Sequence, residues 1–157
     1  MSIWRPHTTN ILIGGLVVIL IAIVASFVLT NFKSTTEVRI GSGIFNARVA
    51  DDEASREKGL SGVKKLDPSD ALLFVFESDY KWGIWMKDME IPIDIVWLNK
   101  DKKVVHMVIE ADPKLSTSKT FTPTVPARYV LELPAGKIKQ SGIKIGESAL
   151  FTLKDEK

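Results

Sequence analysis

The amino-acid sequence predicts a mainly β domain, either a compact β-sandwich of jelly-roll type or a partly open barrel, behind a single transmembrane helix. Three observations support this prediction. Beyond residue 37, about seven to nine short segments alternate apolar and polar residues with a period of two. Turn residues separate these segments, and only one or two short stretches favour a helix. A long uncharged apolar run lies before residue 30.

The composition of the chain limits the classes of function. Its 157 residues suffice for one domain with an N-terminal extension. The chain has no cysteine, which excludes disulfides, thiolate zinc sites and a cysteine nucleophile. The net charge is only +2, and Lys is interspersed with Asp and Glu, without the basic stripe of a nucleic-acid-binding protein. We therefore expect no nucleic-acid partner.

The apolar run from Ile11 to Leu29 contains neither a charged residue nor proline. At about 1.5 Å per residue it reaches roughly 28 Å, enough to cross the hydrocarbon core of a bilayer. A cleaved signal peptide would have a shorter apolar region and a small-x-small cleavage site, so an uncleaved anchor is favoured. We divide the chain into a tail (1–10), an anchor (11–30), a linker (31–36) and a β domain (37–154).

The charges beside the anchor give little indication of its orientation, because Arg5 precedes it and Lys33 and Arg39 follow it. A short tail before one span and a folded domain is the arrangement of a signal anchor. We therefore expect a single-pass membrane protein whose β domain is extracytoplasmic.

Turn and cap residues predict the first elements of the β domain. Residues 37–50 predict a hairpin around the turn Gly41-Ser42-Gly43. A short helix over 51–58 can be capped by its first aspartates and closed by Gly59. The apolar residues 72–76 predict a buried strand.

After a turn at 77–79, the stretch 82–98 predicts two strands and holds three of the four tryptophans. The second strand places Ile93, Ile95 and Trp97 on one face. Because strand side chains alternate, Asp94 then shares the other face with Val96 and Leu98. This aspartate has an unusually apolar setting.

The rest of the chain alternates further strands with turns. Residues 103–109 and 129–133 each show the alternation of a strand. Between them, the Ser/Thr/Pro-rich segment 113–126 is long for a connection, and it predicts either a binding loop or a surface excursion. The last predicted elements are a short turn or helix ended by Gly142, and strands at 143–145 and 149–153.

Six short motifs stand out by their order and spacing: Arg56-x-x-Gly59-Leu60, Leu73-Phe74-Val75-Phe76, Trp85-Met86-Lys87-Asp88, Ile91-Pro92-Ile93-Asp94-Ile95-Val96, the stretch 127–136, and 142–146. Together they resemble the Domain of Unknown Function 192 family, over roughly residues 38–151. The resemblance implies a compact β-sandwich, often behind a signal or anchor segment, and no established activity. The chain departs from the family pattern at Asp88-Met89, where a carboxylate replaces an amide and a hydroxyl is missing.

Asp94 is the least expected residue, because a carboxylate among apolar neighbours costs several kcal/mol unless something pairs with it. We interpret it as the partner of a buried arginine, either Arg56 or Arg128, whose planar guanidinium fits a carboxylate through two hydrogen bonds. The alternative is a catalytic acid or base. The structural interpretation is favoured, because ion-pair networks also bury carboxylates.

Two further carboxylates fit a catalytic role. Glu132 lies mid-strand, opposite in phase to Leu131 and Leu133, where a glutamate by default faces solvent. If Asp94, Glu132 and Asp88 converged with carboxyl groups about 5–10 Å apart, they would meet the minimum for glycoside hydrolysis. These three residues are the catalytic candidates.

Trp85 marks the expected ligand-binding position. Its strand phase is opposite to that of the neighbouring Trp82, so the two cannot face one core, and Trp85 lines a groove or fills a second core layer. Beside Lys87 and Asp88, an exposed indole would suit stacking on a sugar ring or gripping a peptide. The expected ligand-binding set is Trp85, Lys87, Asp88, Arg56 and Arg128.

Few residues favour catalysis or a cofactor. His106 is the only histidine after residue 36, and the chain has no nucleophile elbow, phosphate loop or dinucleotide fingerprint. We expect no metal and no cofactor. The prediction is a membrane-anchored, extracytoplasmic, non-catalytic module of the cell envelope that binds a glycan, a peptide or an envelope protein. The alternatives are a carboxylate-dependent hydrolase of envelope glycans or related substrates, and a structural or assembly module that uses the loop 113–126.

Overall fold

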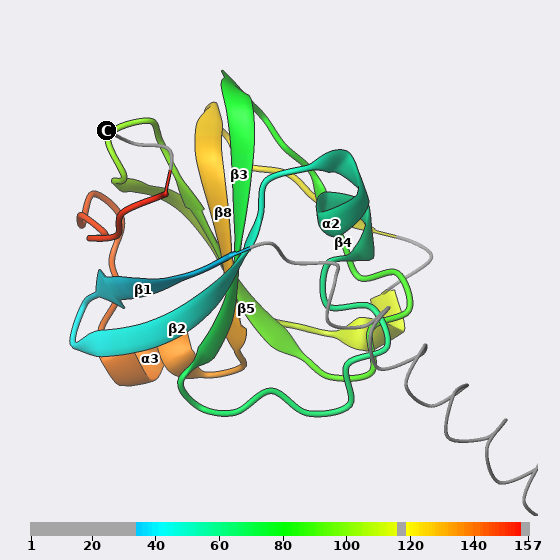
Figure 1. The fold of residues 1–157 in the computed structure, drawn as a ribbon. Coiled ribbons are helices and arrows are strands. Elements are labelled where there is room, and N and C mark those ends of the chain that lie inside the picture. The colour runs from blue at the N-terminus through cyan, green and yellow to red at the C-terminus, as the bar shows by residue number, and fades with distance from the viewer. Residues whose placement is uncertain (1–33, 116–118, 155–157) are drawn as a thin grey trace, which may run out of the picture. The chain divides into compact units, whose positions relative to one another are not determined.

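The computed structural model describes residues 34–115 and 119–154 of the chain (Figure 1). The predicted tail and anchor, residues 1–30, lie outside these ranges. Within the described ranges, no helix is both long enough and apolar enough to span a bilayer. The structure therefore bears on the predicted β domain, residues 37–154.

The β domain is built around one six-stranded sheet. Its strands lie in the order β1, β2, β3, β8, β5, β6, and β4 and β7 form a separate two-stranded sheet. The β2–β3 pair is parallel and the other paired strands are antiparallel. The bounds are β1 (Ser34–Ile40), β2 (Gly43–Ala50), α2 (Glu53–Lys58), β3 (Asp70–Tyr80), β4 (Ile84–Trp85), β5 (Ile93–Leu98), β6 (Val104–Ala111), the 3-10 turn η1 (Pro113–Leu115), β7 (Thr120–Phe121), β8 (Ala127–Pro134) and α3 (Lys137–Ser141). The prediction of a mainly β domain with short helices is confirmed.

The β1–β2 hairpin and helix α2 form where their turn and cap residues predict them. Gly41 has a φ of +57°, and a Cβ at this position would collide with the backbone oxygen of Ser141 in α3. The carboxylate of Asp52 accepts a hydrogen bond from the backbone N of Ser55 at 2.8 Å, and the Ser55 hydroxyl accepts one from the Asp52 backbone N at 3.2 Å. This reciprocal cap fixes the start of α2, and Gly59 ends the helix.

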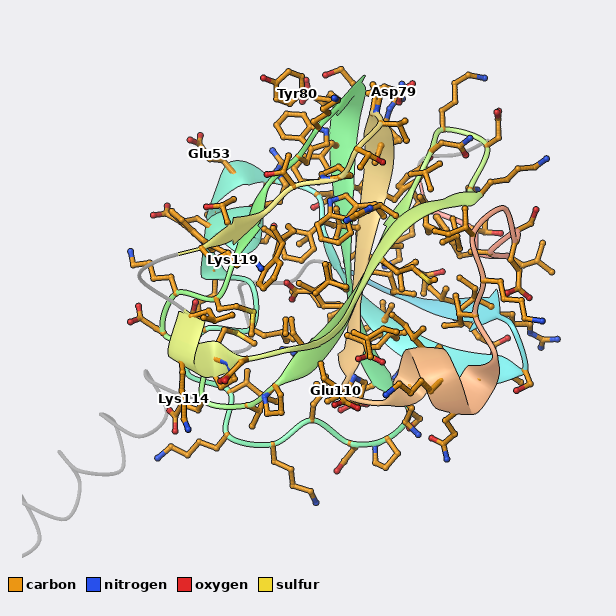
Figure 2. The ribbon with its side chains drawn as sticks, turned by 180° about the vertical axis from the view of Figure 1, so that it is seen from behind. Glu53, Asp79, Tyr80, Glu110, Lys114 and Lys119 are labelled. Atoms are coloured by element: carbon orange, nitrogen blue, oxygen red, sulfur yellow. The ribbon has the colours of Figure 1, made fainter. Side chains whose placement is uncertain are left out.

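Apolar side chains cover both faces of the six-stranded sheet, and Figure 2 shows them packed on either side of it. We call one group the α3-side cluster, because it includes Ile138 of α3, and the other the β4-side cluster, because it includes Ile84 of β4. Strand β5 is buried throughout and alternates between the two. Ile93, Ile95 and Trp97 belong to the β4-side cluster, and Val96 and Leu98 to the α3-side cluster, as the period of two predicts.

The C-terminal segment 146–150 is hydrogen-bonded to both edges of the six-stranded sheet. Arg39 in β1 and Leu150 exchange two backbone hydrogen bonds, of 2.9 and 2.8 Å. At the other edge, Val104 in β6 exchanges two hydrogen bonds of 2.8 Å with the backbone of residues 146 and 147. The strands predicted at 143–145 and 149–153 are wrong, because this part of the chain makes only isolated bridges to the sheet.

Two other boundaries differ from the prediction. Strand β3 continues through the expected turn at 77–79, because after an irregularity Tyr80 pairs again with Ala127 of β8. The strand expected around Trp85 shrinks to the two residues of β4, since its partner β7 is equally short. Strand β7 and η1 both lie in the segment 113–126, so the described part of that segment is partly structured.

Candidate ligand-binding site

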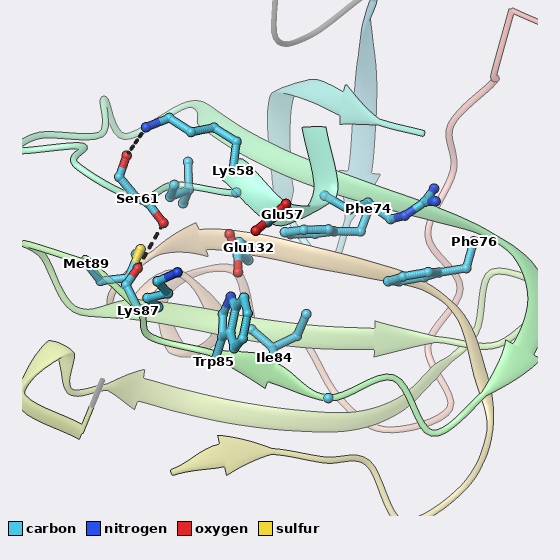
Figure 3. Close-up of a pocket in the computed structure, with 14 residues that line it drawn as sticks. Glu57, Lys58, Ser61, Phe74, Phe76, Ile84, Trp85, Lys87, Met89 and Glu132 are labelled. Atoms are coloured by element: carbon cyan, nitrogen blue, oxygen red, sulfur yellow. Dashed lines mark hydrogen bonds between the residues drawn. The ribbon is translucent and has the colours of Figure 1, made fainter. Parts of the chain in front are cut away.

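A cavity of about 210 Å³ opens on the β4 side of the sheet (Figure 3). Helix α2 and the turn after it form one wall, β3 a second, and residues 83–89 a third, while β8 contributes Glu132 at the base. The volume lies below the roughly 300–1,000 Å³ of sites for drug-sized molecules. The cavity can therefore hold one small organic group.

Two hydrogen bonds hold opposite walls of the cavity together. The Ser61 hydroxyl donates to the backbone oxygen of Lys87 at 2.9 Å, a bond drawn in Figure 3, and the backbone N of Gly62 donates to the oxygen of Asp88 at 2.8 Å. Asp88 adopts a φ of +55°, which aspartate tolerates better than most residues. The turn after α2 and the turn after β4 are thus fixed against each other.

The β3 wall is aromatic and carries a cation. The rings of Phe74 and Phe76 stack with centroids 6.4 Å apart, and the Arg56 guanidinium lies 5.4 Å from the centroid of Phe76. Nη1 of Arg56 also donates to the backbone oxygens of Asp51 and Val75, at 2.8 and 2.9 Å. Arg56 therefore ties α2 to β3 and places a positive charge over the aromatic wall.

Trp85 lies at the mouth of the cavity. Its side chain is 49 % exposed, whereas its strand neighbours Ile84 and Met86 are buried. Nζ of Lys87 lies 5.5 Å from the centroid of the Trp85 ring, within the range of a cation–π interaction. Trp85 therefore lines the cavity and does not fill a core layer.

Glu132 is buried at the base of the cavity with only 3 % exposure. It pairs with Ile95 and Leu72 across β5 and β3, so it lies on the β4-side face of the sheet. Its Oε2 has no hydrogen-bond partner among the described residues. Burial raises the pKa of Glu132 from 4.5 to about 8, an effect that the charge of Arg48 offsets only in part. Glu132 is therefore mostly protonated at pH 7, and the expectation that it faces solvent is wrong.

Asp94 points to the opposite face of the sheet from Glu132. It pairs with Leu133 of the α3-side cluster and is fully buried. Its Oδ1 accepts a hydrogen bond from the backbone N of Glu110 at 2.8 Å, and its Oδ2 accepts one from the backbone N of Ile138 at 2.7 Å. Asp94 thus fixes the first turn of α3 and also Glu110 of β6, whose φ is +52°.

The arginines expected to pair with Asp94 are engaged elsewhere. Arg56 bonds backbone oxygens beside the cavity, and Nε of Arg128 bonds Oδ1 of Asp79 at 2.7 Å in a partly exposed ion pair. The arginine partner predicted for Asp94 is therefore wrong, because its carboxylate accepts hydrogen bonds from two backbone N–H groups. The expected convergence of Asp94, Glu132 and Asp88 is also wrong, because the first two lie on opposite faces of one sheet.

The structure brings together three of the five residues expected to bind a ligand. Arg56, Trp85 and Lys87 line the cavity with Glu132, whereas Asp88 and Arg128 are not among its lining residues. Sequence reasoning missed the aromatic wall, which was assigned only to a buried strand. Its one signal was Phe74-x-Phe76, since a period of two places both rings on the same face.

The family model described as "Uncharacterized ACR" matches residues 36–151 of this chain, and it is the model of Domain of Unknown Function 192. The chain belongs to the Domain of Unknown Function 192 family. The resemblance stated from the sequence is thereby confirmed.

Uncharacterised relatives of the family are found in archaea. A UPF0127 protein of Pyrococcus furiosus is 28 % identical over 122 residues, which cover 74 % of this chain and 91 % of the relative. A UPF0127 protein of Thermococcus kodakarensis is 29 % identical over 112 residues, or 70 % of this chain and 67 % of the relative.

Two crystal structures share the fold. One is a protein of Sinorhizobium meliloti described as a proposed transcription regulator, with a TM-score of 0.71 and 25 % identity, covering 75 % of this chain and 94 % of that one. The other is a protein of unknown function from Novosphingobium aromaticivorans, with a TM-score of 0.67 and 24 % identity, covering 74 % and 83 %.

The side chains that line this cavity offer hydrogen bonds, positive charge and apolar contacts. Within residues 34–115 and 119–154, no three His, Asp or Glu side chains come together in a group that could hold a metal ion. The protonated carboxyl of Glu132 can donate and accept a hydrogen bond, and the aromatic wall offers an apolar surface.

Proposed function

We propose that this protein is a non-catalytic ligand-binding module whose site is the cavity above Glu132. The observation that carries this proposal is that Oε2 of Glu132, at the base of the cavity, has no hydrogen-bond partner in residues 34–115 and 119–154. A buried polar atom without a partner costs about 1–3 kcal/mol, and an apolar side chain at this place would avoid that cost. An unsatisfied polar group inside a cavity with aromatic walls is the arrangement that a small ligand completes.

The binding role is favoured over the hydrolase alternative. Asp94, the leading catalytic candidate, uses both carboxylate oxygens on backbone N–H groups at the other face of the sheet. Beside Glu132, the cavity contains one further carboxylate, the exposed Glu57. Asp94 and Asp88, the carboxylates that the hydrolase hypothesis would combine with Glu132, are not among the residues that line this cavity.

The cellular setting is part of the same proposal. The apolar run 11–29 supports anchoring in a membrane, with the β domain on the extracytoplasmic side and envelope molecules as the source of ligand. A glycan or peptide would place only a single group in a cavity of about 210 Å³. Among the described residues, α2 has six residues and α3 five, too short for a recognition helix, so the description of the Sinorhizobium relative does not lead us to propose DNA binding.

The test is a titration of the full-length protein with a library of small aromatic and aliphatic compounds, followed by ligand-observed NMR. We expect saturable binding that Met89→Trp removes, because Met89 is a half-buried residue of the cavity wall and the indole would fill the space. The matched control is Ile109→Trp, at an exposed position of β6 outside the cavity, which should leave binding unchanged. Absence of saturable binding, or binding that Met89→Trp does not alter, would contradict the proposal.

A further inference from the structure

The charges and rings of the cavity indicate which ligand it takes. We infer that the ligand is a small organic anion with an apolar body, an inference that rests on the proposed function. The negative group of the ligand lies at the mouth of the cavity, and its inner end carries a group that hydrogen-bonds with Glu132. The base of the cavity, its mouth and the faces of its rings each support this assignment.

The base of the cavity matches a neutral polar group. Oε2 of Glu132 is unpaired among the described residues, and the side chain is buried. A protonated carboxyl donates one hydrogen bond and accepts others, so a hydroxyl or carbonyl at the inner end of the ligand satisfies it. The Phe74 and Phe76 rings line the same cavity and suit an apolar body.

The mouth of the cavity is positively charged. Three of its lining residues are basic, namely Arg56, Lys58 and Lys87, and only Glu57 opposes them. With Glu132 neutral, the field at the mouth attracts an anion and repels a cation. Nζ of Lys58 donates to the backbone oxygen of Ser61 at 2.9 Å, which holds this ammonium close to the wall.

Of the three rings that line the cavity, Phe74 is buried, and the other two already carry cations of the protein. Arg56 lies over Phe76 at 5.4 Å, and Lys87 lies over Trp85 at 5.5 Å. A ligand ammonium would have to displace one of these groups before gaining a cation–π contact. An anion instead gains by pairing with them, since both cations line the cavity and Lys87 is exposed.

The decisive experiment compares three probes that share a phenol and differ only in their charged end. They are 4-hydroxyphenylacetate, its neutral amide and the amine tyramine, each titrated into the full-length protein by calorimetry. We expect the carboxylate to bind about tenfold more tightly than the amide, the effect of one charge-assisted hydrogen bond, and tyramine to bind weakest. Equal or tighter binding of tyramine, with release of a proton as Glu132 ionises, would overturn the inference.

Charge variants provide matched controls for the same titration. Lys87→Met should weaken 4-hydroxyphenylacetate several-fold and Glu57→Gln should strengthen it, whereas Lys64→Met, at an exposed position outside the cavity, should leave it unchanged. Unequal effects of Lys87→Met and Lys64→Met therefore separate a contact at the mouth from a change in overall charge. Equal effects of these two variants would contradict the placement of the anion.

The pH profile supplies a second readout. The charge that acts on Glu132 is that of Arg48 from β2, which Asp70 at the start of β3 faces in turn. The charged residues that line the cavity with Glu132 are Arg56, Glu57 and Lys58 from α2, and Lys87 after β4. Anion affinity should fall as the pH rises through about 8, because ionised Glu132 has lost its donor proton and repels the ligand. Glu132→Gln should lose this pH dependence; a profile unchanged by that variant would contradict the contact with Glu132.

Failure of the inference and failure of the proposed function give different results. If library compounds occupy the cavity but the carboxylate is not preferred, the anion inference is overturned and the binding module stands. If neither the library nor any of the three probes binds, both are overturned.

Discussion

Oδ2 of Asp94 accepts a 2.7 Å hydrogen bond from the backbone N of Ile138, which joins the start of β5 to the first turn of a helix 44 residues later. Its other oxygen holds the backbone N of Glu110 in β6. One carboxylate thus replaces the cap that Gly136, at the N-terminus of α3, has no side chain to supply. The buried charge is compensated by two backbone dipoles and needs no arginine.

Substitution of Asp94 should therefore destabilise the fold. In Asp94→Asn, an amide NH₂ replaces one acceptor and faces a backbone N–H, so we expect a loss of about 2–4 kcal/mol in the free energy of unfolding. Urea denaturation of the variant and of the exposed control Asp101→Asn measures this. A stable Asp94→Asn protein that lost ligand binding would instead support a functional role for this residue.

Glu132 should make stability depend on pH. The folded state holds its proton up to a pH of about 8, whereas the unfolded chain releases it near 4.5. Its contribution to stability is therefore complete below pH 4.5 and is lost as the pH rises to about 8, by up to about 1.4 kcal/mol per pH unit. The difference in the free energy of unfolding between wild type and Glu132→Gln, measured across this range, isolates that slope. A constant difference would show that Glu132 titrates normally.

The two arginines of the sequence motifs should differ in their contribution to stability. Arg56→Gln loses two hydrogen bonds to backbone oxygens and the contact with Phe76, and we expect a cost of about 1–3 kcal/mol. Arg128→Gln loses a partly exposed ion pair with Asp79, for which we expect less than about 1 kcal/mol, reduced further by salt. Chemical denaturation of both variants at low and high ionic strength tests the order, and the reverse order would contradict it.

Substitution of Trp97 should lower the stability of the fold, whereas substitution of Trp85 should weaken ligand binding. Nε1 of the fully buried Trp97 donates to the backbone oxygen of Trp82 at 2.8 Å, so Trp97→Phe should cost about 1–3 kcal/mol. Trp85→Phe, at a half-exposed position, should stay within about 0.5 kcal/mol of wild type and weaken 4-hydroxyphenylacetate. Thermal unfolding and calorimetry on each variant give both quantities. Loss of binding in Trp97→Phe alone would contradict the placement of the site.

Features with a local sequence signal could be predicted. The alternation of β5 assigned each of its side chains to the correct face, because a period of two leaves only one choice once the strand is known. The cap of α2 and its end at Gly59 were equally readable from residue types. Both depend on residues within one element.

Features that depend on distant backbone could not be predicted. The partners of Asp94 are N–H groups, which every residue except proline carries, so no side chain pointed to them. Glu132 looked solvent-facing because its strand phase differs from that of its apolar neighbours, yet β8 lies between β3 and β5 with both faces covered. Only the pairing of strands far apart in the chain shows that a glutamate opposite Leu72 and Ile95 is buried.

The bonds between Arg39 and Leu150 have a consequence for synthesis of the protein. Strand β1 leaves the ribosome early, but its outer edge stays open until a residue more than a hundred positions later has emerged. Until then the outer edge of β1 keeps unpaired backbone groups, to which another chain could add. Completion of the fold is tied to release of the C-terminal segment, and folding should be slow for a chain of this size, because its final contact is among its least local.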